Sequence, residues 1–191
     1  MRARTVSDIV KTKPAFNRAY CFDFDETLAT TEARIHVYRK GVFIKSLTSK
    51  EYNFYKKNPG DELDFSEFDD GELILKAKKY KIWPVIKNVS NAIKQDRSTS
   101  EIYILTARSS IVKSFIYEFL KQNGIDIILD NIITIGDGEG NVNISDAKKK
   151  ILTELKNKYA EVLFFDDDIK NIELARSIPG IKTKLVESRY V

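Results

Sequence analysis

The stretch of sequence that decides the fold is residues 19–28, Ala19-Tyr20-Cys21-Phe22-Asp23-Phe24-Asp25-Glu26-Thr27-Leu28. It starts as an apolar run without polar alternation and then turns acidic. Such runs are typical of strands that are buried on both faces of a parallel sheet. Alternate side chains of an extended chain share a side, so we expect the carboxylates of Asp23 and Asp25 to lie together, with Phe22 and Phe24 opposite.

The same pattern recurs along the chain. Short apolar runs also occupy residues 102–105, 132–135, 162–165 and 184–186. The spacing of apolar residues predicts helices over about 84–94, 111–121 and 145–158, the last with Ser145 as its N-cap. Strands that alternate with helices predict an α/β fold, a doubly wound parallel sheet between two layers of helices.

Residues 29–83 interrupt this alternation. Residues 34–45 predict a β-hairpin that turns near Lys40-Gly41. We interpret the acidic run that follows, residues 61–72, as a solvated loop rather than a metal site. We therefore expect residues 29–83 to form an insert, or a small cap, over the C-terminal edge of the sheet within one domain of residues 1–191.

Composition narrows the class of protein. Lys and Arg number 32 against 28 Asp and Glu, a net charge of +4 that suits an anionic substrate but not a polybasic nucleic-acid arm. The single Cys21, which we assign to the core, excludes an intramolecular disulfide and a cysteine-built zinc site and favours a reducing compartment. The single His36 excludes a catalytic histidine pair. No apolar run is long enough to span a bilayer, so we expect a cytoplasmic protein without a membrane partner, whose N-terminal segment to about Arg18 packs on the outside.

Two of the predicted strands end in carboxylates. Asp23 and Asp25 follow the first strand, and Asp166 and Asp167 follow the run at 162–165. In doubly wound sheets, sites form where the carboxyl ends of the strands face a crevice. Carboxylates that converge there repel one another unless a cation lies among them, and oxygen ligands beside a phosphate favour Mg²⁺.

In four motifs the sequence resembles the haloacid dehalogenase (HAD) superfamily. The residues that carry the resemblance are, in chain order, Asp23-Phe24-Asp25-Glu26-Thr27 for its first motif, Leu105-Thr106-Ala107-Arg108 for its second, Lys148 for its third and Asp166-Asp167 for its fourth. The motifs span most of the chain. The resemblance implies a three-layer sandwich with a Rossmann-like sheet in the strand order 5-4-1-2-3, and the acid at Asp25 is typical of the phosphatases of the superfamily.

The resemblance also implies a role for each residue. Asp23 would attack phosphorus and form an aspartyl-phosphate. Asp25 would protonate the leaving oxygen and then activate water. Thr106 and Lys148 would hold the phosphoryl oxygens. The metal ligands would be Asp23, the backbone carbonyl of Asp25, and the carboxylates of Asp166 and Asp167.

Some assignments stay open at the level of sequence. Lys149 and Lys150 compete with Lys148 for the phosphate, and Asp168 has either a direct role or none in the site. Asn171 is expected to fix the loop after the fourth motif. The glycine-rich segment at residues 136–140 has the wrong spacing for a dinucleotide fingerprint and is expected to be a turn.

The sequence says least about the substrate. Arg108, two residues after Thr106, resembles an arrangement in the 3′-phosphatase domain of phage-type polynucleotide kinase-phosphatases, and its guanidinium suits a second phosphate contact. Cations and aromatic rings of the insert would suit a nucleic-acid backbone and its bases, unless the rings are the core of the insert: Arg34, Arg39, Lys40, Lys45, Tyr38, Tyr52, Phe54 and Tyr55. We therefore expect a phosphatase for nucleotides or nucleic-acid ends, with no obligate protein partner. The alternatives are a small-metabolite phosphatase and a catalytically silent binding module of the same fold. A protein serine phosphatase is disfavoured by Asp166-Asp167.

Overall fold

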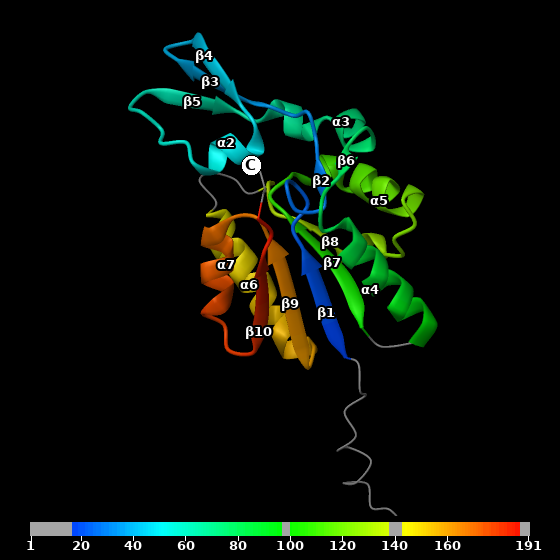
Figure 1. The fold of residues 1–191 in the computed structure, drawn as a ribbon. Coiled ribbons are helices and arrows are strands. Elements are labelled where there is room, and N and C mark those ends of the chain that lie inside the picture. Colours follow the sequence, from blue (N-terminus) through cyan, green and yellow to red (C-terminus); the bar gives the residue numbers. More distant parts are fainter. Residues whose placement is uncertain (1–16, 97–99, 138–142, 188–191) are drawn as a thin grey trace, which may run out of the picture.

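A computed structural model describes residues 17–96, 100–137 and 143–187 of the chain. Its centre is a five-stranded, entirely parallel sheet in the order β10-β9-β1-β7-β8 (Figure 1). The strands are β1 (Arg18–Phe22), β7 (Glu101–Thr106), β8 (Ile132–Thr134), β9 (Glu161–Asp166) and β10 (Ile181–Leu185). The predicted α/β class, with a parallel sheet flanked by helices, is confirmed.

Helices cover both faces of the sheet. On one face lie α4 (Trp83–Asp96) and α5 (Lys113–Gln122), the latter preceded by the 3₁₀ turn η2 (Ser110–Val112). On the other lie α6 (Ile144–Lys158) and α7 (Ile169–Arg176). Each face has its own apolar core, because successive side chains of β1 alternate: Phe22 packs into the first core and Cys21 into the second. This double burial explains why the inner strands β1, β7 and β9 lack polar alternation, whereas the edge strand β10 alternates half-buried residues with exposed lysines.

Cys21 is a core residue, as the apolar context of the sequence indicates. It is free and fully buried, and burial raises the pKa of its thiol well above the ordinary value. A thiol held in the neutral form is a poor nucleophile. Cys21 therefore contributes packing rather than chemistry.

The helices differ from the predictions in one N-cap and in one helix that was not expected. Asn143, not Ser145, is the N-cap of α6, and its side chain accepts hydrogen bonds from the backbone amides of Ser145 and Asp146. The helix α7 was not predicted at all. Its N-cap is Asp168, whose carboxylate accepts from the backbone amide of Lys170. Asp168 therefore has a structural role that explains its acidity.

Residues 29–83, which we call the insert, begin with β2 (Ala29–Thr30), which pairs antiparallel with β6 (Lys78–Lys79) near their end. Between these strands lie α2 (Ser49–Asn53), η1 (Ser66–Asp69), α3 (Gly71–Leu75) and a three-stranded sheet of β4 (Val42–Leu47), β3 (Ile35–Arg39) and β5 (Asp61–Asp64). Figure 1 shows this second sheet beyond the carboxyl ends of the central strands. The strands β3 and β4 form a hairpin whose two-residue turn, Lys40-Gly41, has φ angles of 51° and 75°. Left-handed angles at both positions match the twist of a hairpin, which is why a glycine is found there.

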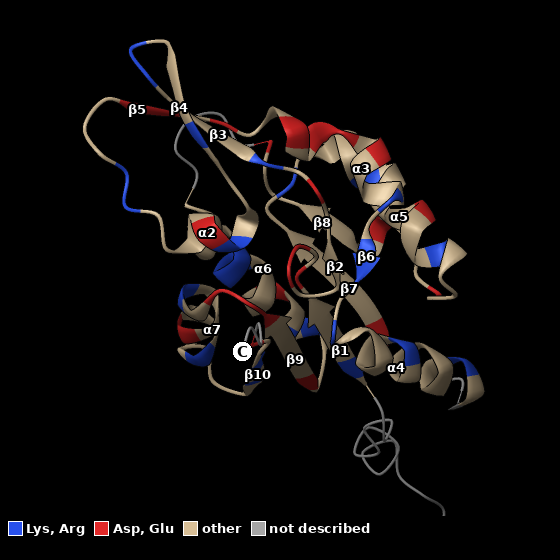
Figure 2. Cartoon of the chain, turned by 45° about the horizontal axis from the view of Figure 1, so that its top comes forward, with Lys and Arg blue, Asp and Glu red and all other residues tan. Residues whose placement is uncertain are grey.

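The interpretation of residues 61–72 as a solvated loop is wrong. Figure 2 shows these acidic residues on β5 and on the segment that leads into α3. Asp61 is buried, forms an ion pair with Arg39 and accepts a hydrogen bond of 2.5 Å from the hydroxyl of Tyr55. Glu67 binds the imidazole of His36 at 2.7 Å. Asp61 and Glu67 therefore act as hydrogen-bond acceptors inside the insert, whereas Glu62, Asp70 and Glu72 are exposed.

Two predictions fall on parts of the chain that are not described. The packing of the N-terminal segment concerns residues 1–16, and most of the glycine-rich turn concerns residues 138–142; both lie outside the described residues. Within the described ranges, none of the helices combines the length and the apolar character needed to cross a bilayer.

The pairing of β1 with β9 positions the site. Phe22 and Phe165 are in register across this pair, and their rings stack with centroids 4.6 Å apart. The amide of Asp23 continues the ladder by donating to the carbonyl of Phe165 at 2.9 Å. Asp23 and Asp166, far apart in the sequence, therefore leave the sheet as direct neighbours.

Candidate active site

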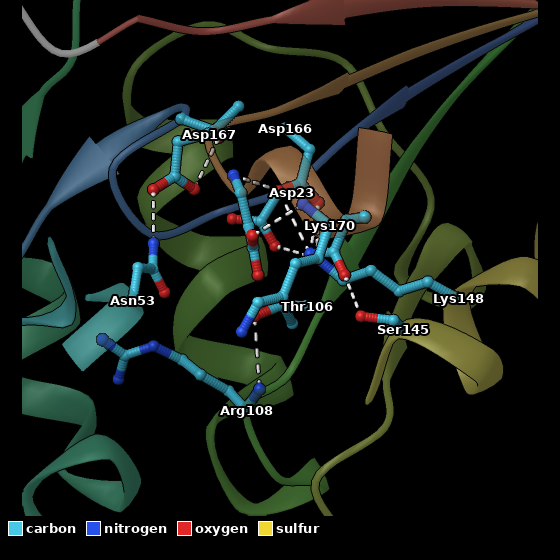
Figure 3. Close-up of polar contacts among 12 residues, drawn as sticks. Asp23, Asn53, Thr106, Arg108, Ser145, Lys148, Asp166, Asp167 and Lys170 are labelled. Atoms are coloured by element: carbon cyan, nitrogen blue, oxygen red, sulfur yellow. Dashed lines mark hydrogen bonds and ion pairs between the residues drawn. The ribbon is translucent and has the colours of Figure 1, made fainter. Parts of the chain in front are cut away.

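The centre of the site is a buried ammonium group between two carboxylates. The Nζ of Lys148 lies 2.6 Å from Oδ1 of Asp23 and 2.7 Å from Oδ2 of Asp166 (Figure 3). Lys148 and Asp166 are 3% and 0% exposed, so water screens neither contact. Of the three adjacent lysines, Lys148 and not Lys149 or Lys150 is the one that enters the site.

The helix explains this choice. Lys148 lies on the same face of α6 as Leu152 and Leu155, four and seven residues further on, and both leucines are buried against the sheet. Residues at this spacing share one stripe of a helix. Lys148 therefore points toward the carboxyl end of the sheet at the point where the apolar stripe ends.

Three carboxylates make up the acidic part of the site. One oxygen each of Asp23, Asp166 and Asp167 lies within 4.8 Å of the others. Burial, and the nearby charges of Asp166 and Asp167, raise the pKa of Asp23 well above its ordinary value despite the ammonium of Lys148. Burial and the charge of Asp166 raise the pKa of Asp167 to about 7. Burial alone would lower the pKa of Lys148, but the two carboxylates raise it. The single ammonium of Lys148 does not neutralise three carboxylates. The cluster therefore keeps an excess negative charge, which favours the binding of a divalent cation.

Hydrogen bonds to both of its carboxylate oxygens hold Asp166 in place. Its Oδ1 accepts from the backbone amide of Asp168 at 2.8 Å, and the amide group of Asn171 donates to both oxygens, at 3.2 and 3.1 Å. The orientation of Asn171 is set in turn by Ser145, whose hydroxyl donates to Oδ1 of Asn171 at 2.7 Å. Ser145 is therefore not the cap of its helix but part of the support of this carboxylate.

Asp167 connects the site to the insert. Its Oδ2 accepts a hydrogen bond of 3.2 Å from the side-chain amide of Asn53, the last residue of α2, and its Oδ1 lies at the limit of hydrogen-bond distance, 3.5 Å, from the hydroxyl of Thr27. Neither contact with Asp167 was predicted, although Thr27 lies in the first motif. No local pattern marks Asn53, because its contact depends on how the insert packs over the sheet.

Asp25 and Arg108 form a second ion pair beside the cluster. The guanidinium of Arg108 donates to both oxygens of Asp25, from Nε at 2.9 Å and from Nη2 at 2.7 Å, and it is 2% exposed. Its remaining bonds go to the hydroxyl of Thr31 and the carbonyl of Phe68, both in the insert. The structure therefore directs the guanidinium, for which we predicted a phosphate contact, to a carboxylate and to the insert. The planar fork of arginine fixes the orientation of Asp25 in this arrangement.

Thr106 is the last residue of β7 and lines the same cavity as the carboxylate cluster and the Asp25–Arg108 ion pair. Its hydroxyl accepts from the backbone amide of Arg108 at 3.2 Å. The loop that follows packs closely on Gly136, where an added Cβ would lie 2.5 Å from the carbonyl oxygen of Ala107. Gly136 is therefore required for the close approach of the two loops that shapes this side of the site.

All seven predicted site residues line one cavity of about 1060 Å³. They are Asp23, Asp25, Thr106, Arg108, Lys148, Asp166 and Asp167. The insert supplies much of the opposite wall, including Tyr52, Asn53 and Phe65. The volume lies at the upper end of the range for small-molecule sites. The arrangement combines a carboxylate that can attack an electrophile, an oxygen-only donor set for a hard cation and a second, oriented carboxylate for proton transfer.

Most of the insert residues that we considered for nucleic-acid contact do not line the cavity. Tyr55 packs on the core of the insert, Tyr38 contacts Phe43 edge-to-face, and Phe54 is 80% exposed. Of the eight cations and rings considered, Tyr52 and Tyr55 line the cavity. The interpretation of the aromatic rings as the insert's own core holds for Tyr55 but not for Phe54.

No protein-family model matches the sequence, and no curated protein matches it. Among solved structures, the chain is similar to the HAD domain of the effector protein Lem4 from Legionella pneumophila, with a TM-score of 0.47 and 18% sequence identity over 88% of this chain and 85% of that chain. An inactive mutant of the same domain aligns with a TM-score of 0.47 and 16% identity over 88% of this chain and 84% of that chain.

Proposed function

We propose that the protein is a Mg²⁺-dependent phosphomonoester hydrolase that forms an aspartyl-phosphate on Asp23 and acts on nucleotides or nucleic-acid phosphate ends. The observation that carries the proposal is the contact of the Lys148 ammonium with both Asp23 and Asp166 in a buried cluster. The order of the four motifs along the chain, which resembles that of the HAD phosphatases, supports it.

The first step is attack by a carboxylate oxygen of Asp23 on phosphorus. The bond from phosphorus to the leaving oxygen breaks, and Asp25 gives that oxygen a proton. In the second step Asp25 takes a proton from a water molecule as the water attacks phosphorus, which releases inorganic phosphate and restores the carboxylate of Asp23. Thr106 donates a hydrogen bond to a phosphoryl oxygen and Lys148 offsets the charge of the group in both steps.

Arg108 acts as a positioning residue for Asp25. Its bidentate contact holds the carboxylate plane while the second lone pair of each oxygen stays available for the proton. Because Arg108 also binds the carbonyl of Phe68, the orientation of Asp25 depends on the insert being in place.

The donor set fits Mg²⁺. The three converging side chains offer only carboxylate oxygens as ligands, and burial together with the neighbouring carboxylates raises the pKa values of Asp23 and Asp167. Asp23, Asp166, Asp167 and the backbone carbonyl of Asp25 would hold the ion. When bound, Mg²⁺ supplies charge stabilisation for the phosphoryl oxygens.

The test is phosphate release from a panel of phosphate esters by the wild type, Asp23→Asn and Asp130→Asn, an exposed aspartate outside the cavity as matched control. We expect Asp23→Asn to be folded and inactive, and Asp130→Asn to keep its activity. After a rapid acid quench, labelled phosphate should stay on the wild-type chain and be absent from Asp23→Asn. EDTA should abolish turnover and Mg²⁺ should restore it. Full activity of Asp23→Asn would overturn the covalent mechanism.

A further inference from the structure

The wall of the cavity that belongs to the insert is aromatic. The rings of Tyr52 and Phe65 meet edge-to-face at 5.3 Å, and those of Phe65 and Phe68 at 6.3 Å. All three residues line the cavity. Tyr52 and Phe65 keep 37% and 41% of their surface exposed, so the insert leaves them open to a ligand rather than burying them in its own core. The wall extends from Asn53, the partner of Asp167, to Phe68, the partner of Arg108.

A second feature of the cavity is a cation that the proposed mechanism does not use. Lys170, in the first turn of α7, lines the cavity, and Figure 3 shows its side chain directed into the site. Its neighbour Asp168 is occupied with the cap of the helix. Among the residues that the structure describes, no carboxylate forms an ion pair with the ammonium of Lys170, whereas Arg108 is paired with Asp25 and Lys148 with Asp23 and Asp166.

We infer that this part of the cavity is a subsite for a nucleotide with two anionic groups, and that it selects the substrate of the proposed phosphatase. The base stacks on the wall of Tyr52 and Phe65, and Lys170 contacts the phosphate group that is not cleaved. A planar ring suits the open aromatic edges, and a second anion suits the unpaired ammonium. The cavity has room for both next to the scissile phosphate. The inference rests on the proposed function only for the position of the scissile phosphate.

The test separates the two features with four kinds of substrate. Adenosine 3′,5′-bisphosphate has the base and the second anion, and the two adenosine monophosphates have the base alone. Fructose 1,6-bisphosphate has the second anion alone, and fructose 6-phosphate has neither. We expect kcat/KM for the adenosine bisphosphate to exceed that for either adenosine monophosphate by roughly tenfold, the size of one partly exposed, charge-assisted hydrogen bond. The base should contribute roughly tenfold as well, in the range of one stacking contact.

Matched variants assign each effect to its residue. Lys170→Gln should lower kcat/KM for the adenosine bisphosphate at least fivefold more than for the monophosphates, and Lys150→Gln, exposed on α6 and outside the cavity, should not. Phe65→Leu should reduce the preference for adenosine over fructose substrates. Phe54→Leu, which changes an exposed ring of the insert that does not line the cavity, is its control.

The outcomes are distinguishable. Phosphate release at equal kcat/KM from all substrates would leave the aspartyl-phosphate mechanism intact but would overturn the subsite and, with it, the preference for nucleotides. If no ester is hydrolysed, the proposed function fails, and calorimetric titration with adenosine 3′,5′-bisphosphate and adenosine 5′-monophosphate decides the subsite alone. Tighter binding of the bisphosphate that is lost in Lys170→Gln would support it, and equal or absent binding of the two would overturn it.

Discussion

Replacement of Lys148 by methionine tests the electrostatic centre of the site most directly. Methionine matches the length of the lysine stem but lacks the ammonium, so the change removes two contacts of 2.6 and 2.7 Å and leaves the stem in place. The carboxylates of Asp23 and Asp166 then lie buried without their cation. Removal of one partner of a buried ion pair typically costs about 3–5 kcal/mol.

That cost translates into a measurable change in the thermal midpoint. For a chain of 191 residues, 3–5 kcal/mol corresponds to a fall in Tm of about 6–20 °C. The assay is thermal unfolding in EDTA, with Lys150→Met, exposed on the same helix, as the matched control. We expect Lys150→Met to unfold within a few degrees of the wild type, about 0.5 kcal/mol or less.

The loss should also depend on pH. The ammonium of Lys148 lowers the pKa of Asp23 and of Asp167, so without it both pKa values rise further above their ordinary values. A carboxyl group whose folded pKa is raised favours folding at low pH, and this contribution is lost as pH rises through the folded value. With Asp167 already at about 7 and an unfolded value near 3.8, the fall in Tm should be small near pH 4 and should grow up to pH 8. Equal midpoints of Lys148→Met and Lys150→Met at pH 8 would refute the reasoning that the ammonium holds this cluster together.

Two further predictions concern the insert and its contact with the site. The first is that Arg108→Lys cannot keep the bidentate contact with Asp25, so kcat for an alkyl phosphate should fall by roughly 10- to 100-fold, part of the range for general acid catalysis. The fall should be clearly smaller for p-nitrophenyl phosphate, because its leaving group needs no proton. An equal loss of kcat for both esters would contradict a role of Arg108 through Asp25. The second concerns Asp61, whose pKa is held below its ordinary value of 3.8, chiefly by the hydrogen bond from Tyr55 and further by the other donors around the carboxylate. Asp61 therefore stabilises the fold above that pH, and this contribution is lost as the pH falls. Asp61→Asn should therefore lower Tm at pH 7, and the difference in Tm from the wild type should narrow below about pH 4. A difference in Tm that stays constant from pH 7 to 3 would argue against this role of the Asp61 carboxylate.

The central sheet was predictable from the sequence because its signal is local. The strands β1, β7, β8 and β9 contain short apolar runs with side chains on both faces, as Cys21 and Phe22 of β1 illustrate, and such runs between helices favour buried parallel strands. The edge strand β10 instead alternates half-buried residues with exposed lysines, so the predicted run at 184–186 overlapped only its end. The core of the site was predictable for the same reason. Asp23 follows β1 directly, Asp166 is the last residue of β9, and Lys148 lies in line with the apolar stripe of α6.

The rest depends on contacts that no local pattern contains. Asn53 and Phe68 reach the site only through the packing of the insert, and the sequence around them has no mark of that contact. Asp168 was open to two interpretations because an aspartate after a strand can be a ligand or a helix cap, and the short α7 that it caps has few apolar residues to reveal it. Ser145 and Asn143 are both good N-caps, so composition alone could not choose between them.

The ladder of β2 and β6 has a consequence for how this chain can change. Because Ala29 pairs with Lys79 and Thr30 with Lys78, the two ends of the insert meet before the chain returns to the central sheet. A segment whose ends are already joined can be lengthened at a cost that rises only with the logarithm of its length, about 0.6 kcal/mol for each doubling. Mutation could therefore rebuild this segment, and with it the aromatic wall over the cavity, while the strands that place Asp23 beside Asp166 stay as they are. The reactive groups and the groups that contact the rest of the substrate are in this sense free to evolve at different rates.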